Sequence, residues 1–192
     1  DYKEMGVRIQ AALTRSERLS RTGDGAAPGT VIGLLSLRGG VGVSTLAVNL
    51  ARHATTVSDR PVVLIDLAFP VGSISLWSGV TGPRHSAALL SRPPSEIDLA
   101  LVRNFSQQNV YGSYFIPGPS DLTDLSGMRM QAMERLLEVL RQAGYVVILD
   151  LGRGTMPLMW RTLAKCDWTG IVTSAETTSR SLAKVLMTSL PD

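Results

Sequence analysis

Short apolar runs alternate with longer amphipathic segments along most of the chain. Four runs rich in Val and Ile have the composition of strands buried on both faces, namely residues 31–37, 62–66, 145–150 and 170–173. Three longer segments carry apolar residues at helical spacing, namely residues 44–53, 128–143 and 179–190. Strand followed by helix, repeated, predicts an α/β fold: a doubly wound, mostly parallel sheet with helices on both faces. In such a fold, ligands bind at the carboxyl ends of the strands.

The first thirty residues follow a different pattern. Apolar residues recur near helical spacing within residues 3–20, which predicts one amphipathic helix. Residues 21–29 are rich in Gly, Ala and Pro and are predicted to be a linker. A lone helix is not stable alone, so its apolar stripe must pack on the body of the chain or on a preceding domain. We therefore expect residues 30–192 to form the globular domain.

Composition places the chain among ordinary globular proteins. Its 192 residues are 44% hydrophobic and 18% charged, which is enough for one compact domain with a core. The single cysteine, Cys166, excludes an internal disulfide and suits a reducing cytoplasm. No apolar run reaches the roughly 18 to 20 residues of a membrane span. The net charge of +3 gives only weak support for nucleic acid or an anionic lipid surface as a partner.

The strongest chemical signal lies between the first predicted strand and the helix that follows it. Three glycines at this junction let the backbone fold tightly and aim several N–H groups at one point, where the helix N-terminus adds positive potential. The sequence predicts a phosphate-binding loop here, formed by Arg38, Gly39, Gly40, Val41, Gly42, Val43, Ser44 and Thr45. Ser44, the first hydroxyl after the loop, is placed to bind Mg²⁺. The alternatives are a merely glycine-rich turn or a dinucleotide loop, whose G-x-G-x-x-G spacing is absent.

This loop resembles the deviant Walker A motif, K-G-G-x-G-K-[ST], of the ParA/MinD class of P-loop ATPases. The resemblance extends over most of residues 30–192, and five positions fall on the motif: Gly39, Gly40, Gly42, Ser44 and Thr45. Arg38 stands where the signature lysine would be, and Val43 stands where the phosphate-binding lysine would be. Val43 leaves the phosphates without a point charge, a loss on the order of 1.5 to 3 kcal/mol. We therefore expect nucleotide binding to survive and fast hydrolysis to be lost.

The segment after the second predicted strand resembles a further element of the class. Residues 63–68 read Val-Leu-Ile-Asp-Leu-Ala, which is similar to the D-x-D segment that holds Mg²⁺ and the attacking water. Asp66 is present, whereas Ala68 replaces the second acid. The absence of this acid, like the absence of the lysine at position 43, argues against fast hydrolysis. The alternative is that Asp66 is only a carboxylate at the end of a strand.

A third segment resembles a Walker B strand followed by a glycine-rich switch. Asp150 follows four apolar residues and would deliver its carboxylate to the magnesium shell, although a hydrogen bond to the neighbouring loop is the alternative use. Arg153 and Gly154 would form the switch that senses the γ-phosphate, unless Arg153 simply faces solvent. The resemblance thus implies ATP and Mg²⁺ as cofactors, with these residues around the metal: Ser44, Asp66 and Asp150.

Within the class, the chain is most similar to the CpaE/TadZ branch, which helps to place type IV Tad pilus machinery at a cell pole. Residues 3–20 resemble the last helix of the receiver-like domain that precedes the ATPase in members of this branch. The resemblance implies a cytoplasmic protein, peripheral at the inner membrane or a cell pole, with partners from a pilus or polar assembly. It also implies a homodimer through the face that carries Arg38, Gly39 and Arg153. Because the family continues with another strand, we expect the domain to be cut short at its C-terminus.

The sequence is compatible with three functions, and it does not decide whether the chain is an enzyme. A degenerate nucleotide-binding localisation protein explains the retained glycines together with the missing lysines. A slow ATPase switch would need Arg38 or a partner subunit to supply charge, and the third possibility is an interaction scaffold without nucleotide. Other residues add little: His53, His85 and Cys166 lack metal-ligand spacing, and three tryptophans are predicted to pack in the interior, namely Trp77, Trp160 and Trp168.

Overall fold

The structure is a computed structural model that describes residues 28–74, 83–108, 112–122, 125–154 and 156–189. The helix predicted at residues 3–20, residues 21–27 of the predicted linker, and Trp77 lie outside the described residues. Across the described ranges, no helix has the length and apolarity that crossing a bilayer requires.

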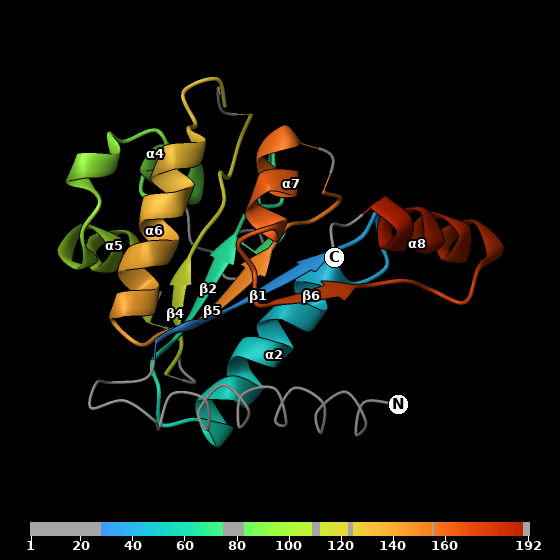
Figure 1. Cartoon of the computed structure of the whole chain (residues 1–192), viewed down its shortest axis with the longest axis horizontal. Coiled ribbons are helices and arrows are strands. Elements are labelled where there is room, and N and C mark those ends of the chain that lie inside the picture. Colours follow the sequence, from blue (N-terminus) through green and yellow to red (C-terminus); the bar gives the residue numbers. More distant parts are fainter. Residues whose placement is uncertain (1–27, 75–82, 109–111, 123–124, 155, 190–192) are drawn as a thin grey trace.

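A central sheet dominates the described part of the chain (Figure 1). Its order is β3-β4-β2-β5-β1-β6. The strands are β1 (Thr30–Leu35), β2 (Val62–Asp66), β3 (Gln107–Gln108), β4 (Tyr114–Ile116), β5 (Val146–Asp150) and β6 (Trp168–Ile171). All neighbouring strands are parallel except β3, which pairs with β4 in the antiparallel sense. The sheet is therefore mostly parallel, as predicted.

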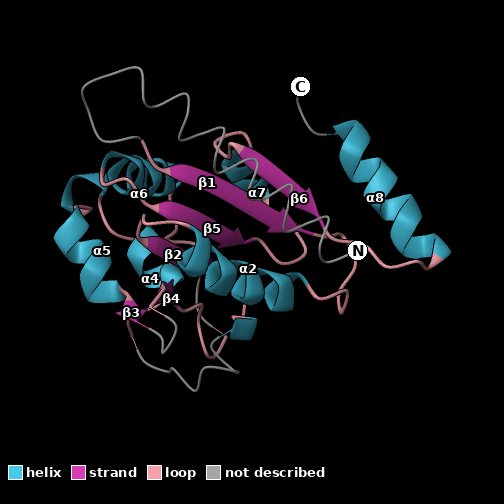
Figure 2. Cartoon of the chain, turned by 90° about the horizontal axis from the view of Figure 1, so that it is seen from below, coloured by secondary structure: helices cyan, strands magenta, loops and turns pink. Residues whose placement is uncertain are grey.

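Helices cover both faces of this sheet, which confirms the predicted doubly wound arrangement. They are α2 (Val43–Val57), α4 (Ser86–Leu90), α5 (Leu99–Phe105), α6 (Met130–Gln142), α7 (Pro157–Leu163) and α8 (Thr177–Ser189), with a 3₁₀ turn at η1 (Pro94–Glu96). Figure 2 shows α2 on one side of the central strands and α6 and α7 on the other. In Figure 1, α8 stands beyond β6, at the side of the sheet.

Alternate residues of the central strands enter two separate cores. On β5, Val147 and Leu149 belong to the core that includes α6 and α7, whereas Val146 and Ile148 belong to the core that includes α2. Because both faces are covered, these strands are continuous apolar runs in the sequence. The same burial fixes the register, since a shift by one residue would exchange the two faces.

The last strand differs from its prediction. β6 begins at Trp168, two residues before the predicted run 170–173, and Trp168 is 44% exposed. The prediction that Trp168 packs in the interior is therefore wrong, whereas Trp160 is partly buried against the core on the α6 side. The physical reason is that β6 is the edge strand of the described sheet, and neighbouring elements cover its faces so sparsely that none of its residues is buried.

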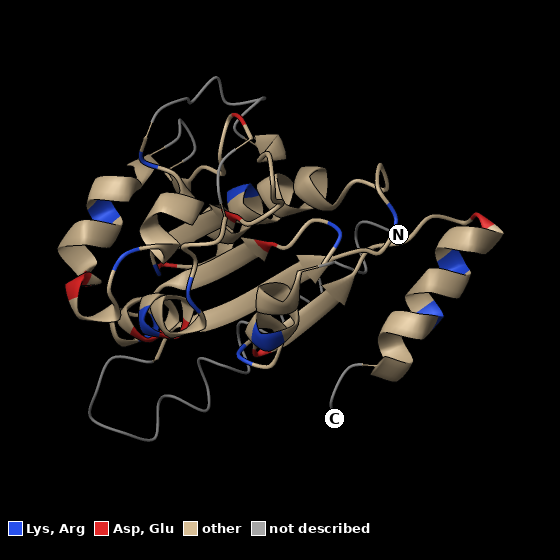
Figure 3. Cartoon of the chain, turned by 90° about the horizontal axis from the view of Figure 1, so that it is seen from above, with Lys and Arg blue, Asp and Glu red and all other residues tan. Residues whose placement is uncertain are grey.

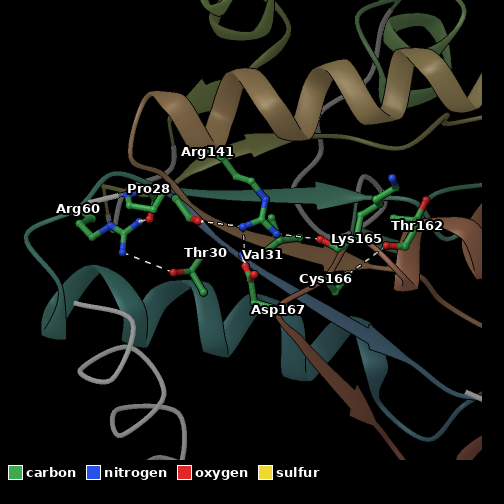
Figure 4. Close-up of polar contacts among 10 residues, drawn as sticks. Pro28, Thr30, Val31, Arg60, Arg141, Thr162, Lys165, Cys166 and Asp167 are labelled. Carbon is green, nitrogen blue, oxygen red and sulfur yellow. Dashed lines mark hydrogen bonds and ion pairs between the residues drawn. The ribbon is translucent and has the colours of Figure 1, made fainter. Parts of the chain in front are cut away.

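Two arginines tie the chain together at the amino ends of the strands (Figure 4). Arg60 donates to the carbonyl oxygens of Gly144, at 2.9 Å, and Pro28, at 2.6 Å. Arg141 forms an ion pair with Asp167, with 2.9 Å between Nη1 and Oδ2. These contacts join segments before β1, β2, β5 and β6. The carboxyl ends of the strands, at the opposite edge, stay available for a site.

Candidate phosphate-binding site

The loop between β1 and α2 opens toward empty space at the N-terminus of α2. Gly40 has φ +78° and Gly42, the N-cap residue of α2, has φ +94°. A Cβ at either position would meet none of the described residues within 4 Å, so the backbone angle rather than crowding requires glycine there. No side chain in the described part of the chain caps α2 through a hydrogen bond. Its first N–H groups are therefore available to an anion.

A pocket of about 450 Å³ lies beside this loop. Its lining comes from residues 38–41 and 43, from residues 67–71 and 73, from residues 151–154, and from Met156 and Met159 near and on α7. The three segments that stand out in the sequence thus follow β1, β2 and β5 and meet at one place. Three of the predicted loop residues, Gly42, Ser44 and Thr45, are not part of this lining. Ser44 reaches its edge through a hydrogen bond to Ser73, and Thr45 is exposed.

A small polar cluster lies at the base of the loop. Asp150, the last residue of β5, is fully buried, and its Oδ1 accepts the Gly152 N–H at 3.0 Å. Its Oδ2 has no hydrogen-bond partner among the described residues. The Oγ atoms of Ser44 and Ser73 lie 2.9 Å apart. Burial raises the pKa of the Asp150 carboxyl, while the Ser44 hydroxyl and the Gly152 N–H act in the opposite direction.

This cluster fits a magnesium ion that arrives with a phosphate. A buried carboxylate oxygen without a donor is costly, and a cation would satisfy it. Mg²⁺ prefers carboxylate, hydroxyl, phosphate and water oxygens. The described residues contain no group of three or more His, Cys, Asp or Glu side chains that could hold a metal by themselves. The cation therefore needs oxygens from a bound phosphate in addition to Asp150 and Ser44.

Asp66, the last residue of β2, has a different environment from Asp150. Its Oδ1 accepts the Ala68 N–H and its Oδ2 accepts the Ile74 N–H, both at 3.0 Å. A Cβ on Gly72 would lie 2.6 Å from Oδ2, so the segment packs tightly on this carboxylate. Asp66 thus anchors residues 67–74 to the end of the strand. Its role as a magnesium ligand stays a prediction.

Two arginines flank the pocket, and their partners differ. Arg38 forms an ion pair with Glu176, the residue before α8, and both side chains are partly exposed. Arg153 lies against Gly39, where an added Cβ would be 3.2 Å from the arginine Nε. Val43 is 8% exposed and packs in the core between α2 and the sheet, although it also borders the pocket.

Sequence reasoning missed two residues of this site. Ser73 stands in the segment after Asp66, so the position of that segment was a signal, but its pairing with Ser44 was not visible. Glu176 is far from Arg38 in the sequence, and no local pattern links them. Elsewhere, positively and negatively charged residues are interspersed over helices and loops (Figure 3). This distribution adds no support for nucleic acid as a partner.

Comparisons with known proteins find one similar sequence and several similar folds, although no protein-family model matches the chain. The chromosome-partitioning ATPase Soj of Thermus thermophilus is 33% identical over 146 residues, which make up 76% of this chain and 55% of that protein. The chain therefore spans about half the length of the curated relative it matches.

Two solved structures share the fold. A ParA family ATPase from Chlorobium tepidum has a TM-score of 0.74 at 23% identity, over 84% of this chain and 66% of that chain. The septum site-determining protein MinD from Pyrococcus horikoshii, solved with Mg-ADP, has a TM-score of 0.67 at 19% identity, over 83% of this chain and 64% of that chain.

Proposed function

We propose that this chain, a ParA/MinD-type P-loop protein in sequence and fold, binds a nucleotide and acts in the localisation or assembly of a cellular machine. In this proposal the bound nucleotide is not hydrolysed quickly. The observation that carries the proposal is the meeting of three motif segments around one pocket, where the buried Asp150 Oδ2 has no hydrogen-bond partner among the described residues. Relatives named for chromosome partitioning and for septum-site determination support the localising part.

The proposed ligand is ATP with Mg²⁺. Backbone N–H groups of residues 39–44 would hold the phosphates, and Ser44 and Asp150 would hold the cation. When bound, Mg²⁺ neutralises phosphate charge. Val43 and Ala68 provide neither a cation nor an acid near the transferring phosphate, which is why we expect turnover to be slow or absent.

The cellular setting is a finer proposal. We propose the Tad pilus role of the CpaE/TadZ branch, with a location in the cytoplasm or peripheral at the inner membrane or a cell pole. Its support is that the segment from Asp66 is similar to the D-L-x-x-x-x-G-x-x-x-L pattern of this branch, and that residues 149–154 are similar to its second acidic switch. The receiver-like domain to which residues 3–20 would belong is part of the same proposal.

The first test is a thermal melt with nucleotide. ATP and Mg²⁺ at about 100 times the dissociation constant should stabilise the parent by about 2.7 kcal/mol. Gly40→Val should still fold but lose this response, because a β-branched side chain at φ +78° distorts the loop. Gly112→Val is the matched control, since Gly112 has φ +88°, faces open space and lies outside the pocket lining. Equal nucleotide responses in the two variants would exclude this loop as the site.

We also propose a two-fold homodimer through the face that carries Arg38, Gly39 and Arg153. The Arg38 ion pair with Glu176 is partly exposed, so it contributes about 1 kcal/mol or less and is readily exchanged for a phosphate or carboxylate of a partner subunit. A stable contact of this kind would bury roughly 1,200 to 2,000 Å².

Light scattering with and without ATP and Mg²⁺ tests the dimer. The parent should reach dimer mass with nucleotide, and Arg38→Ala should remain a monomer. Arg92→Ala, which also removes an exposed arginine with an acidic neighbour, should behave as the parent. A parent that stays monomeric throughout, or an Arg38→Ala protein that dimerises as the parent does, would count against this interface.

A further inference from the structure

The side chain of Arg153 lies across the phosphate-binding loop. A Cβ added to Gly39 would lie 3.2 Å from the Arg153 Nε and 3.5 Å from its Cζ. Arg153 lines the same pocket as Gly40 and Val43. It is exposed, and it forms no ion pair with any residue that the structure describes. Its guanidinium is therefore available to an incoming anion.

Backbone contacts hold the segment that carries Arg153. The Ser36 N–H, directly after β1, donates to the Gly152 carbonyl at 2.9 Å. The Gly152 N–H donates to Asp150 Oδ1 at 3.0 Å. Gly152 and Gly154 have φ +55° and +60°, which turns the chain sharply on each side of Arg153. The position of Arg153 is thus tied to β1 and β5 rather than left to a free loop.

The pocket needs a cation that residue 43 does not supply. Val43 is apolar, and the Arg38 guanidinium is engaged by Glu176. A polyphosphate that enters the loop therefore meets Arg153 as the unengaged positive side chain of the pocket lining. A guanidinium presents a planar fork of N–H donors that matches two phosphate oxygens, and it keeps its charge at every physiological pH.

We infer that Arg153 binds the terminal phosphate of a nucleoside di- or triphosphate held on the loop, and so supplies from the same chain the charge that Val43 lacks. The inference rests on the proposed nucleotide site and names a residue that completes it. It places the phosphate-binding cation on the segment after β5 instead of in the loop before α2.

Calorimetry of ATP and Mg²⁺ binding to four proteins tests this assignment: the parent, Arg153→Gln, Val43→Lys and the double variant. Arg153→Gln should weaken binding by about 10- to 100-fold, which is the loss expected for one charge-assisted contact. Val43→Lys should tighten nucleotide binding by a larger factor in the Arg153→Gln background than in the parent. In that background the new ammonium replaces the charge that the Arg153→Gln change removes. The Arg153→Gln effect should also shrink at high salt.

Arg161→Gln is the matched control. Arg161 is an exposed arginine on α7 outside the pocket lining, so the same change of charge there should alter affinity by less than about threefold. A melt without nucleotide should give the same midpoint for Arg153→Gln and the parent, since the side chain is exposed.

The outcomes distinguish a failure of the role assigned to Arg153 from a failure of the proposed function. If the parent binds nucleotide and Arg153→Gln binds it equally well, the role of Arg153 is wrong while the proposed function stands. If Val43→Lys adds the same factor in both backgrounds, the two positions do not serve the same phosphate, and the inference is again overturned. If the parent shows no nucleotide binding, the proposed function and the inference both fail.

Discussion

Asp150→Asn should be more stable than the parent without ligand and should no longer gain stability from adding Mg²⁺ to ATP. In the parent, Asp150 Oδ2 is buried and lacks a hydrogen-bond partner among the described residues. An unsatisfied buried group of this kind costs about 1 to 3 kcal/mol. The amide oxygen of the variant still accepts the Gly152 N–H, but the neutral amide no longer provides a negative charge that binds the cation.

The effect should depend on pH with a defined sign. Because burial raises the pKa of Asp150, the folded protein holds this proton more tightly than the unfolded chain does. The contribution of this group to stability is therefore fully present below its ordinary pKa of about 4, and it is lost as the pH rises through the raised folded value. The advantage of Asp150→Asn should accordingly be small in acid and reach its full size above that value.

Denaturant unfolding of both proteins at several pH values, without ligand, measures this difference. Asp66→Asn is the matched control with the opposite expected sign. Both oxygens of Asp66 accept backbone N–H groups, and an amide nitrogen cannot accept either of them, so this variant should be destabilised by about 1 to 3 kcal/mol. An Asp150→Asn protein that is less stable than the parent at neutral pH would mean that Oδ2 is satisfied in solution.

Gly118→Ala should destabilise the domain and weaken the nucleotide response together. A Cβ on Gly118 would lie 2.7 Å from the Gly72 Cα and 3.0 Å from the Asp66 Cγ. The Gly72 atom is backbone, so the segment of residues 67–73 must move. Forcing extra volume into such a contact costs about 1 to 3 kcal/mol, and sometimes more. The same segment lines the pocket, so the move also reaches the site.

Denaturant unfolding and the nucleotide melt together measure this pair of effects. Gly127→Ala is the control, because an added Cβ there would first meet the Ser91 hydroxyl, which can rotate away. We expect a change within about 0.5 kcal/mol and an unchanged nucleotide response for that protein. A Gly118→Ala protein with the stability of the parent would show that Gly118 and Gly72 are packed less closely than they are in the structure.

Local patterns determined the centre of the fold and the place of the site. Strands β1, β2 and β5 are buried on both faces and therefore stand out as apolar runs. The amphipathic stripe of α6 and the glycines before α2 are also local signals. Since parallel strands share one carboxyl edge, the sequence also placed the loop, Asp66 and Asp150 near one another.

Contacts between distant residues decided the rest. The strands β3 and β4 and the helices α4, α5 and α7 are only two to seven residues long, which is too short for periodicity to identify them. Trp168 was misjudged because burial of a strand residue depends on whether another element covers the face of the sheet to which its side chain points.

The two aspartates and two arginines of the site illustrate the same limit. In the sequence, Asp66 and Asp150 are equivalent carboxylates that each end a buried strand. The tertiary structure gives Asp66 two backbone donors and leaves one oxygen of Asp150 without any among the described residues. It likewise pairs Arg38 with Glu176 and lays Arg153 over Gly39. Sequence fixes which charges a segment carries, but the chain packing decides which of them are already neutralised and which can still bind a ligand.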